Sequence, residues 1–216
     1  MINELLKKKK WNSQVIHDFL NFLKGYSNEK KCEIVTDVAK ELVKRGDDLS
    51  ITAAEVILIY ATQHYFDVYD NNYKAIVYYQ LGRLYENHIG NFIKAYTYYE
   101  KYTLNNTVNG NDHSILLRTL ILRDDFTYSD ELEKEFRMSL AEADLGLRND
   151  RLYEHLGSFI IANHEGDEKR AEDCKKHLKN IVKGDKFFFL DLALRKDTVP
   201  DSLNVPQKVI DYIEAL

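Results

Sequence analysis

The stretch from Tyr73 to Asn106 constrains the fold of this chain more than any other part of the sequence. Two runs of apolar residues with helical spacing lie on either side of a short break at His88–Asn91. Residues three or four positions apart share one face of a helix. The first run contains Gly82 and the second Ala95, small residues that let a neighbouring helix approach, and large residues flank each of them. The pattern predicts a helical hairpin closed by packing of large side chains against small ones.

This hairpin resembles a tetratricopeptide repeat, a helix–turn–helix unit of about 34 residues. The family's pattern is aromatic-x2-Leu-Gly-x2-Tyr, then Gly-Asn/Asp-aromatic, then Ala-x3-aromatic. The matching elements here are Tyr78-x2-Leu81-Gly82-x2-Tyr85, Gly90-Asn91-Phe92 and Ala95-x3-Tyr99. The turn is one residue longer than in the family, and no proline follows the second helix. The resemblance implies a non-catalytic module that binds a protein or a peptide, as an adaptor, a peptide-sensing regulator or a neutralising partner.

A weaker copy of the same pattern occupies residues 151–182. Tyr153-x2-Leu156-Gly157 repeats the order of the first helix, and Gly166-Asp167-x3-Ala171 repeats that of the turn and the second helix. The two Gly-Asn/Asp turns are separated by about two repeat lengths. One degenerate hairpin, over residues 113–148, would fill the interval.

We therefore expect an all-α fold of about ten helices in antiparallel hairpins, stacked as a short right-handed solenoid like that of the tetratricopeptide family. The expected organisation is a single helical domain, residues 1–216. It consists of a helical lead-in at 1–50, a repeat core at 51–183 and C-terminal capping helices at 184–216. Whether the lead-in belongs to the repeat array is left open.

Several helix boundaries are marked by local signals. The predicted caps at helix starts are Asn12 with Ser13, Ser27, Ser129, and the box formed by Thr52 and Glu55. The apolar run Val56–Ala61 predicts a helix buried on several sides. The segment Lys186–Lys196 is strongly apolar, and its helical context favours a helix over a strand.

Composition narrows the class of protein. Of the 216 residues, 44% are hydrophobic and 30% charged, which is typical of a soluble globular chain. The net charge of -5 argues against a general nucleic-acid coat, and no DNA-reading motif is evident. Two cysteines form no disulfide framework, and no secretory signal or transmembrane stretch is visible. We expect a cytoplasmic protein without a cofactor that binds neither DNA nor a membrane; a homo-oligomer is left open.

In the tetratricopeptide family, the first helix of each hairpin lines the concave binding surface. The resemblance therefore selects one face of two helices as the partner-binding site: Ile76, Tyr79, Arg83, Glu86 and Asn87 in the first unit, and Arg151, Glu154, His155 and Ser158 in the second. Arg83 would hold a carboxylate, Asn87 a peptide backbone and Tyr79 an apolar side chain. The alternative is an ordinary solvated face.

Tyrosines are concentrated in the same region. Eleven of the 15 tyrosines lie between Tyr60 and Tyr102. Tyr79, Tyr96 and Tyr98 fall off the packing stripe of the hairpin, so they either bind a partner or pack between adjacent repeats.

Two further kinds of site are weaker. Cys174-x2-His177, with His164 nearby, offers too few ligands for zinc, so we predict no metal site and a packed Cys174. Arg148-x6-His155 and Arg170-x6-His177 fit the spacing of the helical HEPN ribonucleases, which cleave RNA without a metal. Such matches arise by chance in a chain with seven histidines, so they carry little weight. A ribonuclease of this kind, or an RNA-binding protein, is therefore kept only as the alternative to the non-catalytic module.

Overall fold

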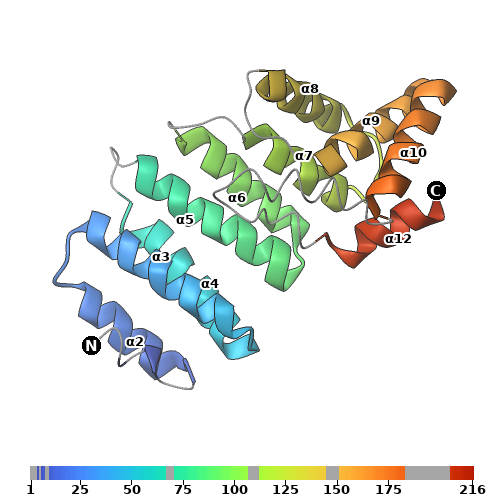
Figure 1. Ribbon diagram of the computed structural model, residues 1–216. Helices are drawn as coiled ribbons and strands as arrows, with labels where there is room; N and C mark the ends of the chain where they lie inside the picture. Colours follow the sequence, from blue (N-terminus) through green and yellow to red (C-terminus); the bar gives the residue numbers. More distant parts are fainter. Residues whose placement is uncertain are drawn as a thin grey trace. The chain divides into compact units, whose positions relative to one another are not determined.

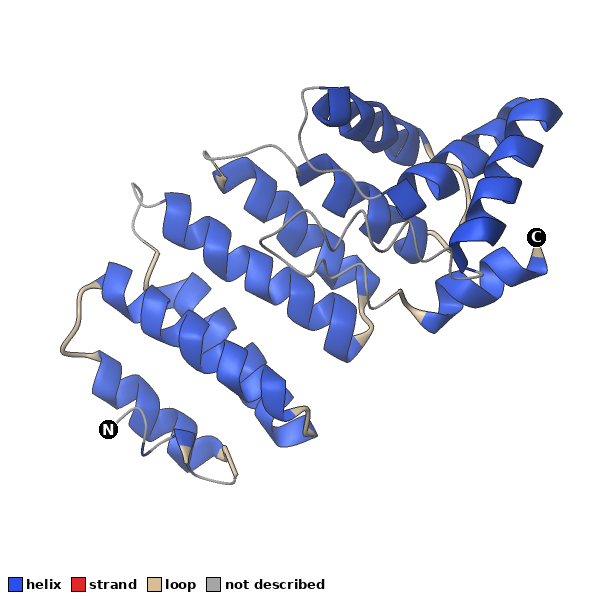
Figure 2. Ribbon diagram, viewed as in Figure 1, coloured by secondary structure: helices blue, strands red, loops and turns tan. Residues whose placement is uncertain are grey.

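The computed structural model describes residues 4, 6–7, 10–66, 71–106, 112–144, 151–182 and 205–216. Over these residues the protein consists of helices and their connections, with no strand, which confirms the predicted all-α class (Figure 2). In chain order the helices are α2 (Ser13–Leu23), α3 (Asn28–Arg45), α4 (Asp48–His64), α5 (Asn71–Leu84), the π-helix η1 (Tyr85–Ile89), α6 (Phe92–Asn105), α7 (Asp112–Arg123), α8 (Asp130–Asp144), α9 (Arg151–Glu165), α10 (Glu168–Val182) and α12 (Gln207–Ala215) (Figure 1).

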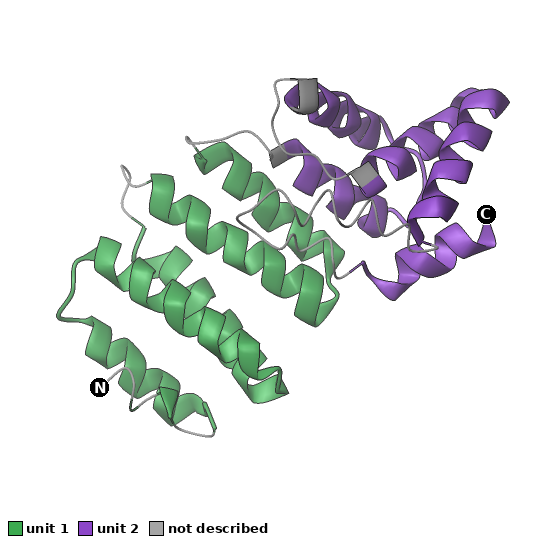
Figure 3. Cartoon of the chain, in the orientation of Figure 1, with its two compact units in different colours: residues 1–109 green, residues 110–216 purple. Residues whose placement is uncertain are grey.

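The chain divides into two compact units, residues 1–109 and residues 110–216 (Figure 3). Unit 1 contains the hairpins α3–α4 and α5–α6, and unit 2 contains α7–α8 and α9–α10. In each unit, the first helix of the second hairpin also packs against both helices of the hairpin before it. The same packing rule in both units is compatible with a helical repeat. The assignment of the whole chain to a single domain stays a prediction.

Polar side chains begin the helices where the sequence predicts. The Asn12 side chain accepts a hydrogen bond from the Val15 N–H at 3.1 Å. Ser27 and Ser129 likewise accept from the N–H three residues further along, at 3.3 and 3.1 Å. Each bond satisfies one of the N–H groups that a helix start leaves without a partner inside the helix.

The predicted helix start at Thr52 and Glu55 is wrong. Helix α4 begins at Asp48, because the side chain of Asp47 caps it: the carboxylate accepts from the Ser50 N–H at 3.0 Å and from the Ser50 hydroxyl at 2.7 Å. Aspartate is among the strongest N-caps, and here it makes two bonds. Thr52 is an exposed residue inside the helix.

Helix α4 also buries less of its surface than the sequence predicts. Ala54, Ile57, Leu58 and Ala61 are buried, whereas Val56, inside the same apolar run, is 40% exposed. The helix therefore has one buried side and one that faces solvent.

The hairpin α5–α6 closes in the predicted way. A Cβ atom added to Gly82 would lie 2.5, 2.6 and 2.9 Å from three ring atoms of Tyr99. The absent side chain thus makes room for a tyrosine ring rather than for a second backbone. Tyr99 is fully buried, and its hydroxyl donates to the Glu86 carboxylate at 2.7 Å.

Both repeat-like hairpins turn at a glycine in the left-handed conformation. The φ angles are 71° at Gly90 and 73° at Gly166. The next residues, Asn91 and Asp167, cap the following helices by accepting from the N–H three positions on, at 3.0 and 3.1 Å. Glycine takes a positive φ without steric cost, which explains the Gly-Asn/Asp sequence at both turns.

The glycine of the weaker unit packs differently. A Cβ atom on Gly157 would lie 3.1 Å from Phe136 of α8 and 3.3 Å from Leu117 of α7. Gly157 therefore admits side chains of the preceding hairpin, whereas Gly82 admits one from its own hairpin. The repeat of the sequence pattern does not carry over into identical packing.

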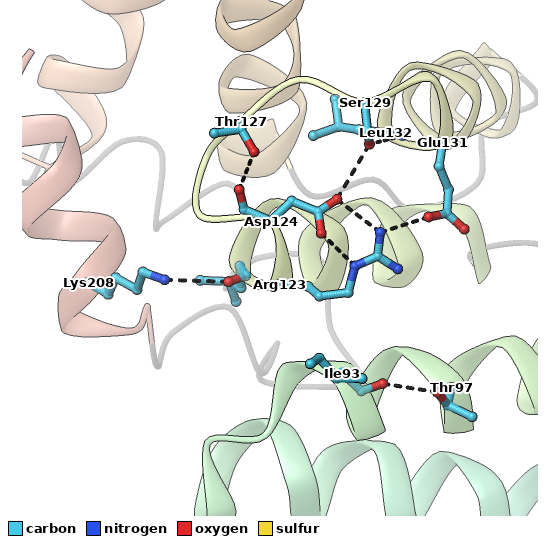
Figure 4. Close-up of polar contacts among 10 residues, drawn as sticks. Ile93, Thr97, Arg123, Asp124, Thr127, Ser129, Glu131, Leu132 and Lys208 are labelled. Carbon is cyan, nitrogen blue, oxygen red and sulfur yellow. Dashed lines mark hydrogen bonds and ion pairs between the residues drawn. The ribbon is translucent and has the colours of Figure 1, made fainter.

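A polar network fixes the connection between α7 and α8 (Figure 4). Arg123 forms ion pairs with Asp124 at 2.6 Å and with Glu131 at 2.7 Å. The Asp124 carboxylate also accepts from the Ser129 hydroxyl at 3.4 Å, and the backbone carbonyl of Asp124 accepts from the Thr127 hydroxyl. These bonds hold a short loop that is otherwise without regular structure.

The same loop carries the contacts to the last helix. Phe126 stacks on Tyr212 of α12 with ring centres 4.0 Å apart, and Lys208 pairs with Asp125 at 2.9 Å. Asp125 and Phe126 both have left-handed φ angles, 54° and 59°, which residues other than glycine rarely adopt.

The final helix that the sequence predicts is confirmed. The helix predicted at Lys186–Lys196 lies outside the described residues, and so do residues 145–148 of the degenerate hairpin.

Among the described helices, none combines the length and the apolar character that a membrane crossing requires.

Candidate functional site: a groove between α3 and α5

Two adjoining hollows follow α5 of unit 1 on its side toward α3, the neighbouring helix in Figure 1. Their volumes are about 430 Å³ and about 240 Å³. Lys40 and Gln80 line both hollows, so the hollows adjoin at these residues, and we call the pair of hollows the α3–α5 groove. The larger hollow is its tyrosine end, lined also by Asn72, Ala75, Ile76, Tyr79, Tyr102 and Asn106. The smaller hollow is its cationic end, lined also by Val43, Lys44, Arg83, Leu84 and His88.

Three of the five residues selected in the first unit line this groove. Ile76 and Tyr79 lie at the tyrosine end, and Arg83 lies at the cationic end. Asn87 is exposed and is not among the lining residues. Glu86 is 7% exposed and accepts the hydrogen bond from Tyr99, so its carboxylate lies inside the hairpin rather than on its surface.

The π-helix η1 explains why Glu86 and Asn87 leave the predicted face. Hydrogen bonds in a π-helix join residues five positions apart, compared with four in an α-helix. The N–H of Gly90 accordingly binds the carbonyl of Tyr85. A residue five positions after Arg83 therefore returns to the groove, and this residue is His88. The extra residue in the turn, relative to the family pattern, is the sequence signal for this change.

At the tyrosine end, the aromatic rings pack against each other and against a guanidinium group. The Tyr79 and Tyr102 ring centres are 5.2 Å apart, and the Arg83 guanidinium lies 5.9 Å from the centre of the Tyr79 ring. The hydroxyl of Tyr102 accepts from the Asn106 amide at 2.9 Å. Ile76 adds an aliphatic side chain that is 44% exposed. This end offers apolar ring surface next to amide groups.

The cationic end has a one-sided charge. Lys40, Lys44 and Arg83 contribute three positive charges, and none of the described residues that line the groove is acidic. Partial desolvation of the imidazole, and then the charge of Arg83, lower the pKa of His88, so this exposed side chain adds less positive charge than an ordinary histidine.

The lysines have acidic neighbours on their own helix. Lys44 pairs with Glu41 at 2.5 Å and Lys40 with Asp37 at 3.8 Å, and all four side chains are about half or more exposed. Exposed pairs of this kind are weak, on the order of 0–1 kcal/mol. The lysines can therefore turn to an anionic ligand at little cost.

The other two off-stripe tyrosines have packing roles. Tyr96 is buried. Tyr98 stacks on Tyr85 with ring centres 5.5 Å apart, and the Tyr85 hydroxyl donates to Glu55 of α4. The Tyr98 and Tyr85 rings join α6 to η1, and Tyr85 joins η1 to the preceding hairpin, whereas Tyr79 lines the groove.

The residues selected in the second unit are in contact with neighbouring side chains. Glu154 accepts from the Ser139 hydroxyl at 3.4 Å, and Ser158 accepts from Arg170 at 3.0 Å. His155 stacks on His177 of α10 with ring centres 5.0 Å apart. The side chain of Arg151 lies outside the described residues. Lining of a groove by these four residues stays a prediction.

The pairing demanded by the ribonuclease alternative is described only in part. Arg148 lies outside the described residues. Arg170 donates to Ser158 and to Glu165, at 3.0 and 3.3 Å. Cys174 is buried, and no group of three or more metal-binding side chains occurs among the residues that the structure describes. The absence of catalysis remains an expectation.

Sequence reasoning missed Lys40, Lys44 and His88. The two lysines come from a segment assigned to the lead-in, and only the packing of α3 on α5 brings them to Arg83.

In comparisons with known proteins, no protein family, no curated protein and no solved structure matches this chain.

Proposed function

We propose that unit 1 is a tetratricopeptide-like module that binds a peptide, or an extended segment of a partner protein, in the α3–α5 groove. The observation that carries the proposal is the position of Ile76, Tyr79 and Arg83. The repeat pattern selects these residues, and all three line the α3–α5 groove, where α3 and α6 supply the facing side chains.

The chemistry of the groove supports a peptide ligand. The larger hollow, about 430 Å³, falls within the range of about 300–1,000 Å³ that is typical of ligand pockets, and the smaller one, about 240 Å³, lies below it. Tyrosine and arginine are the residues that most often dominate binding energy at protein interfaces. The amide of Gln80, shared by both ends, has donors and an acceptor that suit a peptide backbone.

The proposed role is that of an adaptor, a peptide-sensing regulator or a neutralising partner in the cytoplasm, without catalysis and without a cofactor. Each of these roles requires only that a partner segment occupies the groove. The test of the groove therefore comes before the choice among them.

Peptide display on the full chain tests the proposal. A random dodecapeptide library should yield ligands whose binding falls at least about tenfold in Tyr79→Ala, because truncation of a central aromatic residue removes a dominant contact. Tyr26→Ala is the matched control, since Tyr26 is a 38% exposed tyrosine of the same unit that does not line the groove. Ligands that bind both variants equally well would place the binding surface elsewhere.

A further inference from the structure

We infer that the ligand of the α3–α5 groove is an extended acidic peptide whose carboxylates lie about four residues from an aromatic or large aliphatic side chain. This inference rests on the proposed function and adds the ligand's charge and spacing to it.

The requirement for carboxylates comes from the cationic end. Lys44 and Arg83 line a hollow of about 240 Å³ together with the shared Lys40, and none of the other described residues that line it is acidic. A peptide that brings positive charge to this end would be repelled, and a neutral one would forgo the attraction. A pair of carboxylates matches the three cations, and arginine can bind one of them through two parallel hydrogen bonds.

The requirement for a large apolar side chain comes from the tyrosine end. Tyr79, Tyr102 and Ile76 line a hollow of about 430 Å³, nearly twice the volume of the cationic end. Rings held at 5.2 Å from each other lose little freedom when a further apolar group packs against them. Asn72 and Asn106 beside the rings can bind the backbone on either side of the inserted side chain.

The spacing comes from the geometry of α5, which lines both ends. Its residues at the tyrosine end centre near Ile76, and those of α5 and η1 at the cationic end centre near Leu84. These centres are about eight residues apart, or about 12 Å at about 1.5 Å per residue of helix. An extended peptide covers about 3.3 Å per residue, so about four residues bridge the two ends.

Carboxylates are favoured over phosphates because the described residues that line the groove include a single arginine. Proteins that recognise phosphorylated peptides typically use clusters of arginine. Asp37 and Glu41 lie next to Lys40 and Lys44 and weaken the positive electrostatic potential of the groove. A moderate potential suits singly charged carboxylates better than doubly charged phosphates.

Synthetic peptides test the charge and the spacing on the full chain. The probes are fluorescein-labelled peptides of glycine and serine with one phenylalanine and a Glu-Glu pair, separated by about two, four or seven positions. Fluorescence anisotropy should show the four-position peptide binding at least about tenfold more tightly than the other two, and than its Gln-Gln counterpart. The difference should shrink as salt rises, since salt screens the charges.

Variants of the chain test whether the peptide binds in the α3–α5 groove. Lys44→Gln and Arg83→Gln should each weaken the four-position peptide by about fivefold or more, and Tyr79→Ala should weaken it as well. Lys24→Gln is the matched control, because it removes the same charge from an exposed position outside the groove. In Lys44→Glu/Arg83→Glu, a Lys-Lys peptide of the same spacing should bind in place of the Glu-Glu peptide.

Each contrary result has a definite meaning. If displayed peptides depend on Tyr79 but bind without acidic residues, or if the Gln-Gln peptide binds equally well, the inference is overturned and the proposed function stands. If phosphoserine in place of glutamate tightens binding more than about tenfold, the carboxylate assignment is wrong. If no synthetic or displayed peptide depends on Tyr79, the inference and the proposed function both fail.

Discussion

Gly82→Ala tests the closure of the α5–α6 hairpin most directly. From the sequence alone its sign is open, because helix propensity and packing act in opposite directions. Alanine is favoured over glycine inside a helix by about 1 kcal/mol. An extra methyl group in a packed interior typically costs about 1–3 kcal/mol.

The structure decides the sign. The new Cβ would lie 2.5–2.9 Å from three ring atoms of Tyr99, well inside the distance of ordinary contact. The ring cannot turn away freely, because it is fully buried and its hydroxyl is bound to Glu86. We therefore take the upper part of the packing cost, about 2–3 kcal/mol, and expect a net loss of about 1–2 kcal/mol in the free energy of unfolding.

Thermal and urea unfolding of the full chain measure this loss. For a cooperative unit of about 100 residues, the melting temperature should fall by about 5–15 °C. Gly25→Ala is the control, since a Cβ there would meet no atom within 4 Å and the change should stay within about 0.5 kcal/mol.

The Tyr99→Ala background isolates the contact. Without the ring, Gly82→Ala should stabilise the protein by about 1 kcal/mol, the value of helix propensity alone. A reversal of sign between the two backgrounds is the expected signature. If Gly82→Ala stabilises the chain with Tyr99 in place, the glycine does not accommodate the ring and the hairpin is closed in another way.

Three further predictions concern other parts of the chain. Asp47→Ala should cost about 0.5–2 kcal/mol in urea unfolding, whereas Thr52→Ala should stay within about 0.5 kcal/mol; equal effects would contradict the start of α4 at Asp48. Burial raises the pKa of Tyr65 from 10.0 to about 12, so its proton is held more tightly in the folded state. Its contribution to stability is complete below pH 10.0 and is lost as the pH rises to about 12; Tyr65→Phe should reduce the alkaline fall in melting temperature, and an unchanged profile would refute the assignment. Purified protein should leave RNA intact with or without divalent metal, and cleavage that His177→Ala abolishes would establish the ribonuclease alternative.

Local patterns in the sequence were sufficient for the hairpin. The left-handed Gly90 and the cap at Asn91 act over a few residues, and Gly82 and Tyr99 belong to one hairpin, so spacing and turn chemistry reveal them. The start of α4 is also set locally, by a cap that the prediction at Thr52 and Glu55 overlooked. Asp47 prevails over Thr52 because its carboxylate makes two bonds to Ser50.

The groove depends on contacts that no local pattern encodes. Lys40 and Arg83 are far apart in the chain and become neighbours only when α3 packs against α5. Nothing in a single sequence pairs these two helices. The residue types at one wall of the groove were predictable from the repeat pattern, whereas the opposite wall and most of the positive charge were not.

Because Tyr85–Ile89 form a π-helix, the side chains that line the groove depend on the exact number of residues in this segment. A substitution at His88 would change one side chain, whereas deletion of the first residue of this segment would rotate its remaining residues by about 100° relative to α5. Such a deletion would carry His88 away from Arg83 and release Glu86 from Tyr99 at the same time. Insertions and deletions of a single residue at this position could therefore alter which ligands the groove accepts while the helices on either side keep their own sequences, a route to new specificity that point mutation does not provide.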